Sequence, residues 1–175
     1  MTPFTLLHDI AKRCRAHAAD LPSKAEAVEY WRGVGFVLGG QRYVAPMSDV
    51  SEILTAPKLT PVPGVKHWVQ GVANVRGRLI PVMDLAAFLG GRAASQRTKR
   101  TLIIEKGDVL NGLVVDAVLG MQYFSTESKD TSSSLGLSET AKPFVSGSYT
   151  RDGEDWPVFS FDALIEDQHY MDIAV

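Results

Sequence analysis

The sequence lacks the features by which secreted and membrane proteins are recognised. Its 175 residues include a single cysteine, Cys14, so no disulfide can form within the chain. An unpaired cysteine is typical of a reducing compartment. No apolar run approaches the ~18 residues of a membrane-spanning helix, and the first residues lack the apolar core of a signal peptide. We therefore expect a soluble cytoplasmic protein without direct membrane insertion.

The chain also has no excess of basic residues. It carries 18 lysines and arginines against 20 aspartates and glutamates, which gives a net charge of −2. A domain that binds a nucleic-acid duplex usually shows the opposite balance. One cationic cluster is interpreted as a solvated linker rather than a phosphate-binding patch; it consists of Arg92, Arg97, Lys99 and Arg100. We expect no nucleic-acid partner.

No catalytic or metal-binding set is recognisable. A G-x-S-x-G elbow and a phosphate-binding loop are both absent, and no cysteine nucleophile has a partner. The spacing of the histidines does not suit a zinc site; they are His8, His17, His67 and His169. Asp116 interrupts an apolar run, where a buried general base is conceivable, but we favour an aspartate at the rim or end of a strand. We expect no enzyme, no cofactor and no metal site.

The first 32 residues have helical patterning. Thr2 followed by a proline is a typical helix start. Apolar residues then recur at spacings of three and four: Phe4, Leu7, Ala11, Cys14 and Ala18. A capping box at 23–26 predicts a second short helix, which would carry Val28 and Trp31. We expect both helices to pack on the rest of the protein, with Cys14 buried, rather than to recognise a partner.

From Gly35 onward, short apolar runs alternate with turn residues. The predicted strands lie at 36–38, 43–45, 50–54, 101–105, 110–115, 118–124, 144–149 and 156–161. The first two strands flank a four-residue connection, and we expect the third to extend the same sheet. Asp84 and Asp162 are placed to cap short helices that follow strands. Many short strands joined by glycine turns predict a barrel or a sandwich.

The run from Trp68 to Leu85, WVQGVANVRGRLIPVMDL, is the most informative segment of the chain. Its two apolar halves meet at Arg76 and Gly77, which predicts a β-hairpin with a cation at its tip. The same run closely resembles the signature G-V-x-N-x-R-G-x-x-x-P-x-x-D-L of CheW-like domains, the coupling modules of bacterial chemotaxis. Further fragments similar to this family occur in the family's order at 41–46, 50–53, 62–64, 112–118, 144–147 and 158–162.

This resemblance implies a fold and a division of the chain. The implied fold is mainly β, with two side-by-side SH3-like five-stranded β-barrel subdomains, an N-terminal helical extension and a short C-terminal helix. The extension would cover 1–32 and the CheW-like domain 33–175. Subdomain 1 would comprise 33–90 plus 143–165, and subdomain 2 would comprise 100–142.

The resemblance also implies a function without catalysis. It implies an adaptor that couples the cytoplasmic tip of a methyl-accepting chemoreceptor to the regulatory domain of a CheA-type histidine kinase, in the cytoplasm and associated with membrane-bound receptor arrays. Carried over to this sequence, the receptor-binding residues would be Val50, Glu52, Gly71, Val72, Asn74 and Arg76. The kinase-binding residues would be Gly112, Val115, Asp116 and Val118.

The chemistry of the receptor-binding residues suits a helical partner. An exposed Arg76 offers a planar fork of donors to carboxylates or backbone carbonyls on a receptor helix. Beside it, Val50, Ile53 and Val72 either line an apolar groove or pack in the core, two interpretations that the sequence leaves open. Glu52 would pair with a cation of the partner or with Arg76 itself.

Both ends of the chain resemble one branch of the family. The extended N-terminus, from Phe4 to Leu7, and the end at 172–175 resemble the adaptor of the chemosensory pathway for twitching motility by type IV pili. The alternative is a small β-barrel module, unrelated to chemotaxis, that binds a peptide or a nucleic acid. The sequence leaves open which receptor and kinase are recognised, the output of the pathway, the role of the extension and the oligomeric state.

Overall fold

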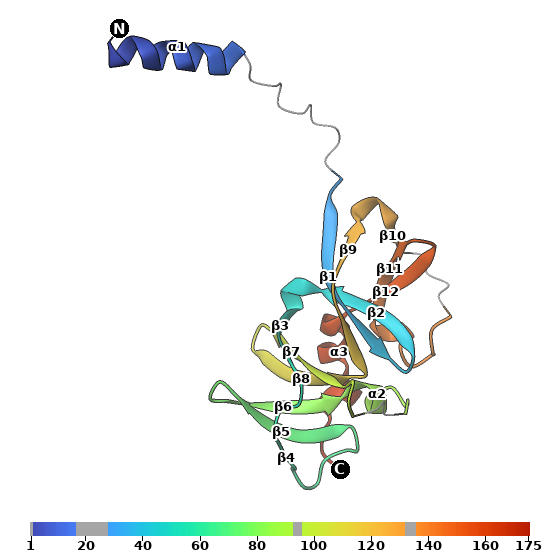
Figure 1. The fold of residues 1–175 in the computed structure, drawn as a ribbon. Helices are drawn as coiled ribbons and strands as arrows, with labels where there is room; N and C mark the ends of the chain where they lie inside the picture. Colours follow the sequence, from blue (N-terminus) through green and yellow to red (C-terminus); the bar gives the residue numbers. More distant parts are fainter. Residues whose placement is uncertain (1, 17–27, 93–95, 132–135) are drawn as a thin grey trace.

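The computed structural model describes residues 2–16, 28–92, 96–131 and 136–175, and it shows two six-stranded sheets side by side (Figure 1). Sheet A consists of β1 (Tyr30–Leu38), β2 (Gln41–Pro46), β9 (Ala117–Ser125), β10 (Lys129–Asp130), β11 (Val145–Arg151) and β12 (Glu154–Phe159). Sheet B consists of β3 (Val50–Leu54), β4 (Leu59–Thr60), β5 (Val69–Val75), β6 (Arg78–Asp84), β7 (Arg100–Lys106) and β8 (Val109–Val115). The predicted mainly β fold of two neighbouring units is confirmed.

The strand order explains how the chain is shared between the sheets. It is β10-β11-β12-β2-β1-β9 in sheet A and β3-β7-β8-β6-β5-β4 in sheet B. Each sheet thus has five longer strands, as the family resemblance implied, plus one two-residue strand. Because β8 pairs in parallel with β6, residues 109–115 lie in the same sheet as 69–84. A second parallel pair joins β12 to β2 in sheet A.

Turn residues set the hairpins. At the tip of the β5–β6 hairpin, Arg76 and Gly77 have φ angles of 52° and 79°. A two-residue turn with positive φ at both positions matches the twist of the two strands, so the predicted hairpin is confirmed. The connection between β1 and β2 is shorter than predicted: it contains only Gly39 and Gly40, with φ angles of 57° and 82°. The predicted sheet membership of 50–54 is also wrong, because β3 pairs with β7 in sheet B.

Short helices accompany the sheets in the described residues. They are α1 (Pro3–Ala16), η1 (Met47–Asp49), α2 (Leu85–Phe88), η2 (Thr126–Ser128), η3 (Lys142–Phe144), α3 (Phe161–Glu166) and α4 (Gln168–Met171). Asp84 caps α2 as predicted, since its side chain accepts a hydrogen bond from the Ala87 N–H at 3.0 Å. The predicted cap of the C-terminal helix, Asp162, is wrong. Ser160 caps α3 instead, because its hydroxyl oxygen accepts a hydrogen bond from the Ala163 N–H at 3.2 Å.

The largest hydrophobic cluster joins the two sheets. It takes side chains from both sheets and from α2, α3 and α4, among them the fully buried Phe36, Leu85, Leu102, Phe159, Phe161 and Tyr170. Two smaller clusters each belong to one sheet. The cluster of sheet A consists of Val44, Phe124, Tyr149, Trp156 and Val158, with Trp31 packed against it, and that of sheet B is built on Ala73, Val82 and Val114.

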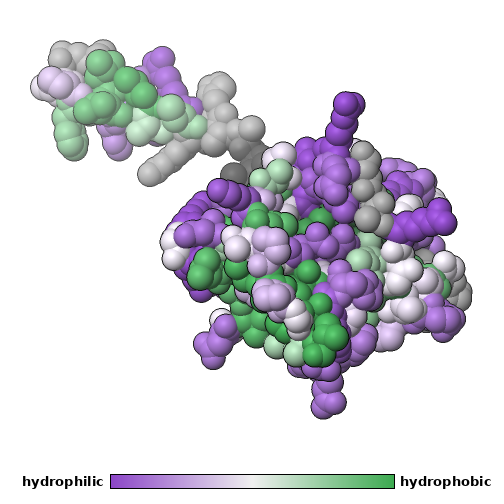
Figure 2. Space-filling view, turned by 90° about the horizontal axis from the view of Figure 1, so that it is seen from below, coloured by the Kyte–Doolittle hydropathy of each residue, from purple (hydrophilic) through white to green (hydrophobic). Residues whose placement is uncertain are grey.

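The N-terminal region departs from the prediction at two points. The predicted helix α1 exists, but its apolar side chains are exposed, with Phe4 80% and Leu7 65% accessible, as the apolar surface along the helix shows (Figure 2). Cys14 is likewise exposed rather than buried. The main core already has α2, α3 and α4 packed on it, and α1 does not join them.

The second predicted helix lies mostly outside the described residues, but its end can be compared. Trp31 belongs to β1 rather than to a helix. Its ring stacks on Tyr149 at a centroid distance of 4.7 Å and lies 6.2 Å from Phe124. Because these contacts come from strands far away in sequence, the local capping signal at 23–26 could not reveal them.

Candidate functional site

The hairpin tip of β5–β6 lies next to β3, although β7 and β8 separate the hairpin from β3 in the order of sheet B. A guanidinium nitrogen of Arg76 is 3.3 Å from a carboxylate oxygen of Glu52, which confirms one of the two predicted pairings of Glu52. The Arg76 side chain remains 80% exposed, whereas that of Glu52 is 28% exposed. Asn74 fixes the turn, because its side-chain oxygen accepts a hydrogen bond from the Gly77 N–H at 2.9 Å. The tip therefore presents a cation that is held by an ion pair with Glu52 and is still accessible to solvent.

A shallow groove of about 470 Å³ separates β3 and its following loop from this tip. Its walls are Glu52, Leu54, Thr55, Ala56, Pro57, Lys58, Asn74, Val75 and Arg76. Three of the six predicted receptor-binding residues, Glu52, Asn74 and Arg76, thus line one hollow. The surface combines a cation, an amide and aliphatic side chains, which suits an amphipathic partner.

The apolar members of the predicted face lie partly beneath it. Val50 and Val72 are half-buried, and Val50 packs against the main core. Ile53 is 42% exposed, so it is accessible to a partner. Gly71 is buried with a φ of 134°, and a Cβ there would lie 2.3 Å from the Thr60 carbonyl oxygen. Gly71 therefore allows β4 to approach β5 and does not itself present a side chain.

The predicted kinase-binding residues lie mostly in the interior. Val115 is fully buried, and Gly112 is buried between Val82 and Thr101. Asp116 is 7% exposed at the corner between β8 and β9, and its carboxylate accepts a hydrogen bond from the Gly39 N–H at 2.7 Å. This agrees with the interpretation of Asp116 as an aspartate at a strand end. Of the four residues, only Val118 is partly exposed, so direct contact with a partner is limited to it.

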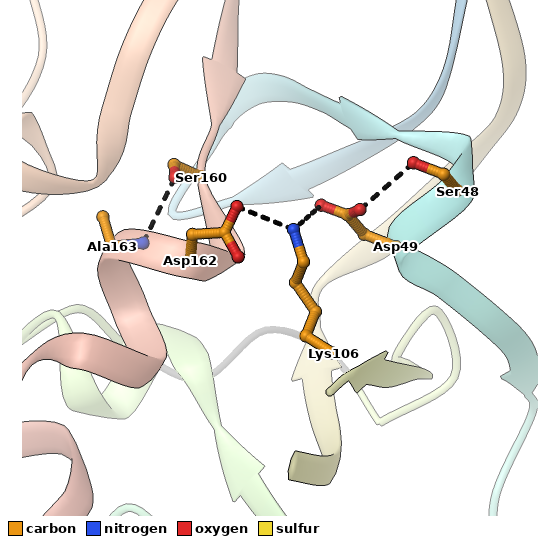
Figure 3. A network of polar contacts seen from close by, with 6 residues as sticks. All are labelled: Ser48, Asp49, Lys106, Ser160, Asp162 and Ala163. Carbon is orange, nitrogen blue, oxygen red and sulfur yellow. Dashed lines mark hydrogen bonds and ion pairs between the residues drawn. The ribbon is translucent and has the colours of Figure 1, made fainter. Parts of the chain in front are cut away.

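A partly buried charge network near the start of β3 was not foreseen from the sequence (Figure 3). The Lys106 ammonium lies 3.2 Å from Asp49 and 2.7 Å from Asp162. Ser48 adds a hydrogen bond from its hydroxyl to the Asp49 carboxylate, at 3.1 Å. The hydrogen bond to Asp162 is the main cause that raises the pKa of Lys106; Asp49 raises it further, and burial opposes both. Lys106 lies 57 positions from Asp49 and 56 from Asp162, so no local pattern joins them.

The cationic cluster near the linker is only partly a solvated segment. Lys99 pairs with Asp84 at 3.3 Å, and the two side chains are 12% and 4% exposed. Arg100 donates to the backbone carbonyls of Arg97 and Lys99. Arg92 and Arg97 are exposed, as predicted for a linker. The interpretation of all four as solvated is therefore wrong for Lys99, because the carboxylate of the α2 cap draws it inward.

Membrane spans and metal sites can be assessed for the described part of the chain. Within it, no helix is both long and apolar enough to cross a bilayer. Within the same residues, no group of three or more histidine, cysteine, aspartate or glutamate side chains is arranged to hold a metal ion.

Comparisons with known proteins agree with this architecture. The family model described as "CheW-like domain" matches residues 32–169. The protein PilI of Pseudomonas aeruginosa is 49% identical over 176 residues, covering 99% of this chain and 97% of that protein. The chemotaxis protein CheW of Thermotoga maritima is 34% identical over 97 residues, or 55% of this chain and 64% of that protein.

A solved structure has the same fold. The scaffolding protein TtCheW of Thermoanaerobacter tengcongensis superposes with a TM-score of 0.69 at 27% sequence identity, covering 83% of this chain and 99% of its own. The matched region of the family model begins at residue 32 and therefore excludes α1. With a family match over most of its length and a near full-length relative, this chain belongs to the family of CheW-like domain proteins.

Proposed function

We propose that this protein is a non-enzymatic adaptor that couples a methyl-accepting chemoreceptor to a CheA-type histidine kinase, in a chemosensory pathway that controls twitching motility by type IV pili. Membership of the CheW-like family supports the adaptor role. The names of the similar proteins, among them a chemotaxis protein and a scaffolding protein, support it further. The near full-length similarity to PilI supports assignment to the pilus pathway.

The single observation that carries the receptor contact is the exposed guanidinium of Arg76 held by Glu52 at the edge of a groove. An ion pair in water contributes little to stability, so we expect this pair to orient the guanidinium rather than to stabilise the fold. Arg76 keeps free donors for a helix of the receptor, while Asn74 holds the turn that presents it. Val50 and Val72 would support the groove from below, and Gly71 would let β4 close its edge.

For the kinase contact we propose the surface over the β8–β9 corner. Val118 would touch the kinase, and the buried Gly112, Val115 and Asp116 would shape that corner from inside. Individually weak contacts to receptor and kinase become strong when several act together in an array. In this proposal the protein associates with membrane-bound receptor arrays through these contacts, without inserting into the membrane.

The test is a side-by-side capture of chemoreceptor and histidine kinase by the wild type and Arg76→Glu. We expect the variant to lose the receptor and to retain the kinase, because the charge reversal opposes Glu52 and the acceptors of the partner alike. Its Tm should stay within about 3 °C of the wild type, since the substitution is at the surface. Arg97→Glu is the matched control, with the same charge change on an exposed arginine outside the groove. Full recovery of the receptor by Arg76→Glu would refute the proposed face.

A further inference from the structure

The chain crosses between the two sheets at points where aspartates make specific contacts. Between β2 and β3 it passes through η1, which ends at Asp49, and between β8 and β9 it passes through Asp116. After β12 it leaves sheet A into α3, which contains Asp162. Lys106, at the end of β7, binds the first and the last of these connections at once. Figure 3 shows its ammonium between the two carboxylates.

We propose that Lys106 is a positioning residue for the receptor face, an inference that rests on the adaptor function proposed above. Asp49 directly precedes Val50, the first residue of β3, and Val50 pairs with Ile104, two positions before Lys106. The register of β3 then shifts by one residue before Glu52, which pairs with Ile103. The ion pair of Asp49 with Lys106 therefore holds the strand end from which Glu52 reaches Arg76.

Because this ion pair is partly buried, its loss should cost more stability than the loss of an ion pair at the surface. The side chains of Lys106 and Asp49 are 23% and 11% exposed. Without the ammonium, the Asp49 carboxylate would retain only the hydroxyl of its neighbour Ser48 as a polar partner among the contacts seen. A buried charge without its counter-ion is strongly destabilising, so η1 would move to bring Asp49 toward water.

A movement of η1 would also displace the receptor face, because β3 follows η1 directly and carries Glu52. As the first strand in the order of sheet B, β3 has β7 as its one neighbour among the described strands of that sheet. Glu52 sits 3.3 Å from Arg76, so a displacement of about 1 Å exceeds the range of a hydrogen bond. A lysine suits the network, because a compact ammonium with three donors can serve two carboxylates from different directions.

The experiment uses the full chain and three variants. Lys106→Met removes the charge and keeps the length, and Lys106→Arg restores a cation. Lys66→Met is the matched control: Lys66 is 22% exposed and lies 2.9 Å from Asp172, so it has a similar ion pair that involves neither η1 nor β3. Hydrogen exchange is measured for the β3 amides at 50–54. Affinity is measured by titration with the recombinant cytoplasmic tip of the chemoreceptor that the wild type captures.

We expect Lys106→Met to accelerate exchange at 50–54 and to weaken receptor binding about tenfold, because the face is no longer held in place. Lys106→Arg should recover most of both, and Lys66→Met should change neither. Arg76→Glu should cost less affinity in the Lys106→Met background than in the wild type, because the two residues act on one contact. Unchanged exchange in Lys106→Met, or an equal change in Lys66→Met, would overturn the positioning role.

The two proposals fail in different ways. If Arg76→Glu leaves receptor binding intact, the proposed receptor face is wrong, and exchange at 50–54 still decides whether Lys106 positions β3. If Arg76→Glu abolishes binding but Lys106→Met alters neither affinity nor exchange, the receptor face stands and the role of Lys106 is refuted.

Discussion

The two sheets use arginine in opposite ways. In sheet A, Arg151 lies over the rings of Phe124 and Trp156, at 4.8 and 5.0 Å from their centroids, and Arg42 lies 5.0 Å from Trp156 on the same sheet. Arg151 also donates hydrogen bonds to Gln122 and to the carbonyl of Tyr123. These guanidinium groups are engaged with the protein's own aromatic rings. They therefore contribute to packing and to stability.

In sheet B the smaller hydrophobic cluster is aliphatic, and the side chain of Arg76 at the hairpin tip is exposed. Ala73, Val82 and Val114 form the centre of the cluster, and the groove beside β3 stays unfilled. Arg76 has one carboxylate partner and an 80% exposed side chain. Two sheets of equal strand number thus differ in their use of side chains: sheet A fills its smaller cluster with aromatic rings, and sheet B leaves a cation and a groove exposed at its edge.

The largest expected effect comes from breaking the aromatic cluster of sheet A. Trp156→Ala should lower the free energy of unfolding by about 3–5 kcal/mol, because it leaves a cavity where the ring touches Phe124, Arg42 and Arg151. Denaturant unfolding measures the loss. Leu79→Ala, at a side chain that is 72% exposed in sheet B, should cost less than about 0.5 kcal/mol. Equal losses in both variants would remove the contrast between the sheets.

The next effect tests how the edge of sheet B is closed. Gly71→Ala should destabilise the protein by about 1–3 kcal/mol, because an added Cβ would collide with the backbone of Thr60. Gly40→Ala is the comparison, since Gly40 also has a positive φ of 82° but no atom within 4 Å of an added Cβ. Both free energies of unfolding come from denaturant titration. A cost at Gly71 no greater than that at Gly40 would show that β4 can move away freely.

A smaller effect concerns the corner between the sheets. Asp116→Ala removes the acceptor of the Gly39 N–H and should cost about 1–2 kcal/mol in the free energy of unfolding. Asp116→Asn retains a side-chain oxygen and should cost less. Calorimetric Tm values for the two variants provide the measurement. If both lose equal stability, the negative charge of Asp116 matters more than its hydrogen bond.

The smallest effect is a pH dependence at the ion pair between Arg42 of β2 and Glu154 of β12 in sheet A. The hydrogen bond from Arg42, with its positive charge, lowers the pKa of Glu154 below its ordinary value of 4.5. Because the pKa of Glu154 is lower in the folded state than in the unfolded state, the ionised carboxylate stabilises the fold. This stabilisation is fully present above the unfolded-state pKa and is lost as the pH falls through the folded-state pKa. We expect an NMR titration of the Glu154 carboxyl carbon to show the lowered midpoint. Arg42→Ala should return it toward 4.5, and an unchanged midpoint would contradict the assignment.

The elements that were predicted correctly depend on residues close together in the chain. The β5–β6 hairpin depends on two neighbouring turn residues, and the cap of α2 depends on Asp84 three positions before its donor. The helix α1 follows from apolar spacing within 14 residues. Within the candidate site, the turn at Arg76 was predicted, and its ion pair with Glu52 was one of two predicted pairings.

The elements that were missed depend on distant contacts. Trp31 lies in a strand because β9 pairs with it, and its ring packs against Phe124 and Tyr149. Lys99 turns inward to Asp84, fifteen positions earlier in the chain. The network around Lys106 joins residues 56 and 57 positions away. None of these pairings leaves a periodic signal in the sequence.

The sequence by itself determined the family, the hairpin that presents Arg76 and the turns that shape it, because backbone preferences and a short signature act locally. Only the tertiary structure decided which strands share a sheet, which cations face water, and that Val115 and Gly112 are buried rather than exposed. The parallel pairs β6–β8 and β2–β12 bring together strands distant in the chain. Such pairings are selected by the burial of apolar surface across the whole molecule, a quantity that no single segment contains.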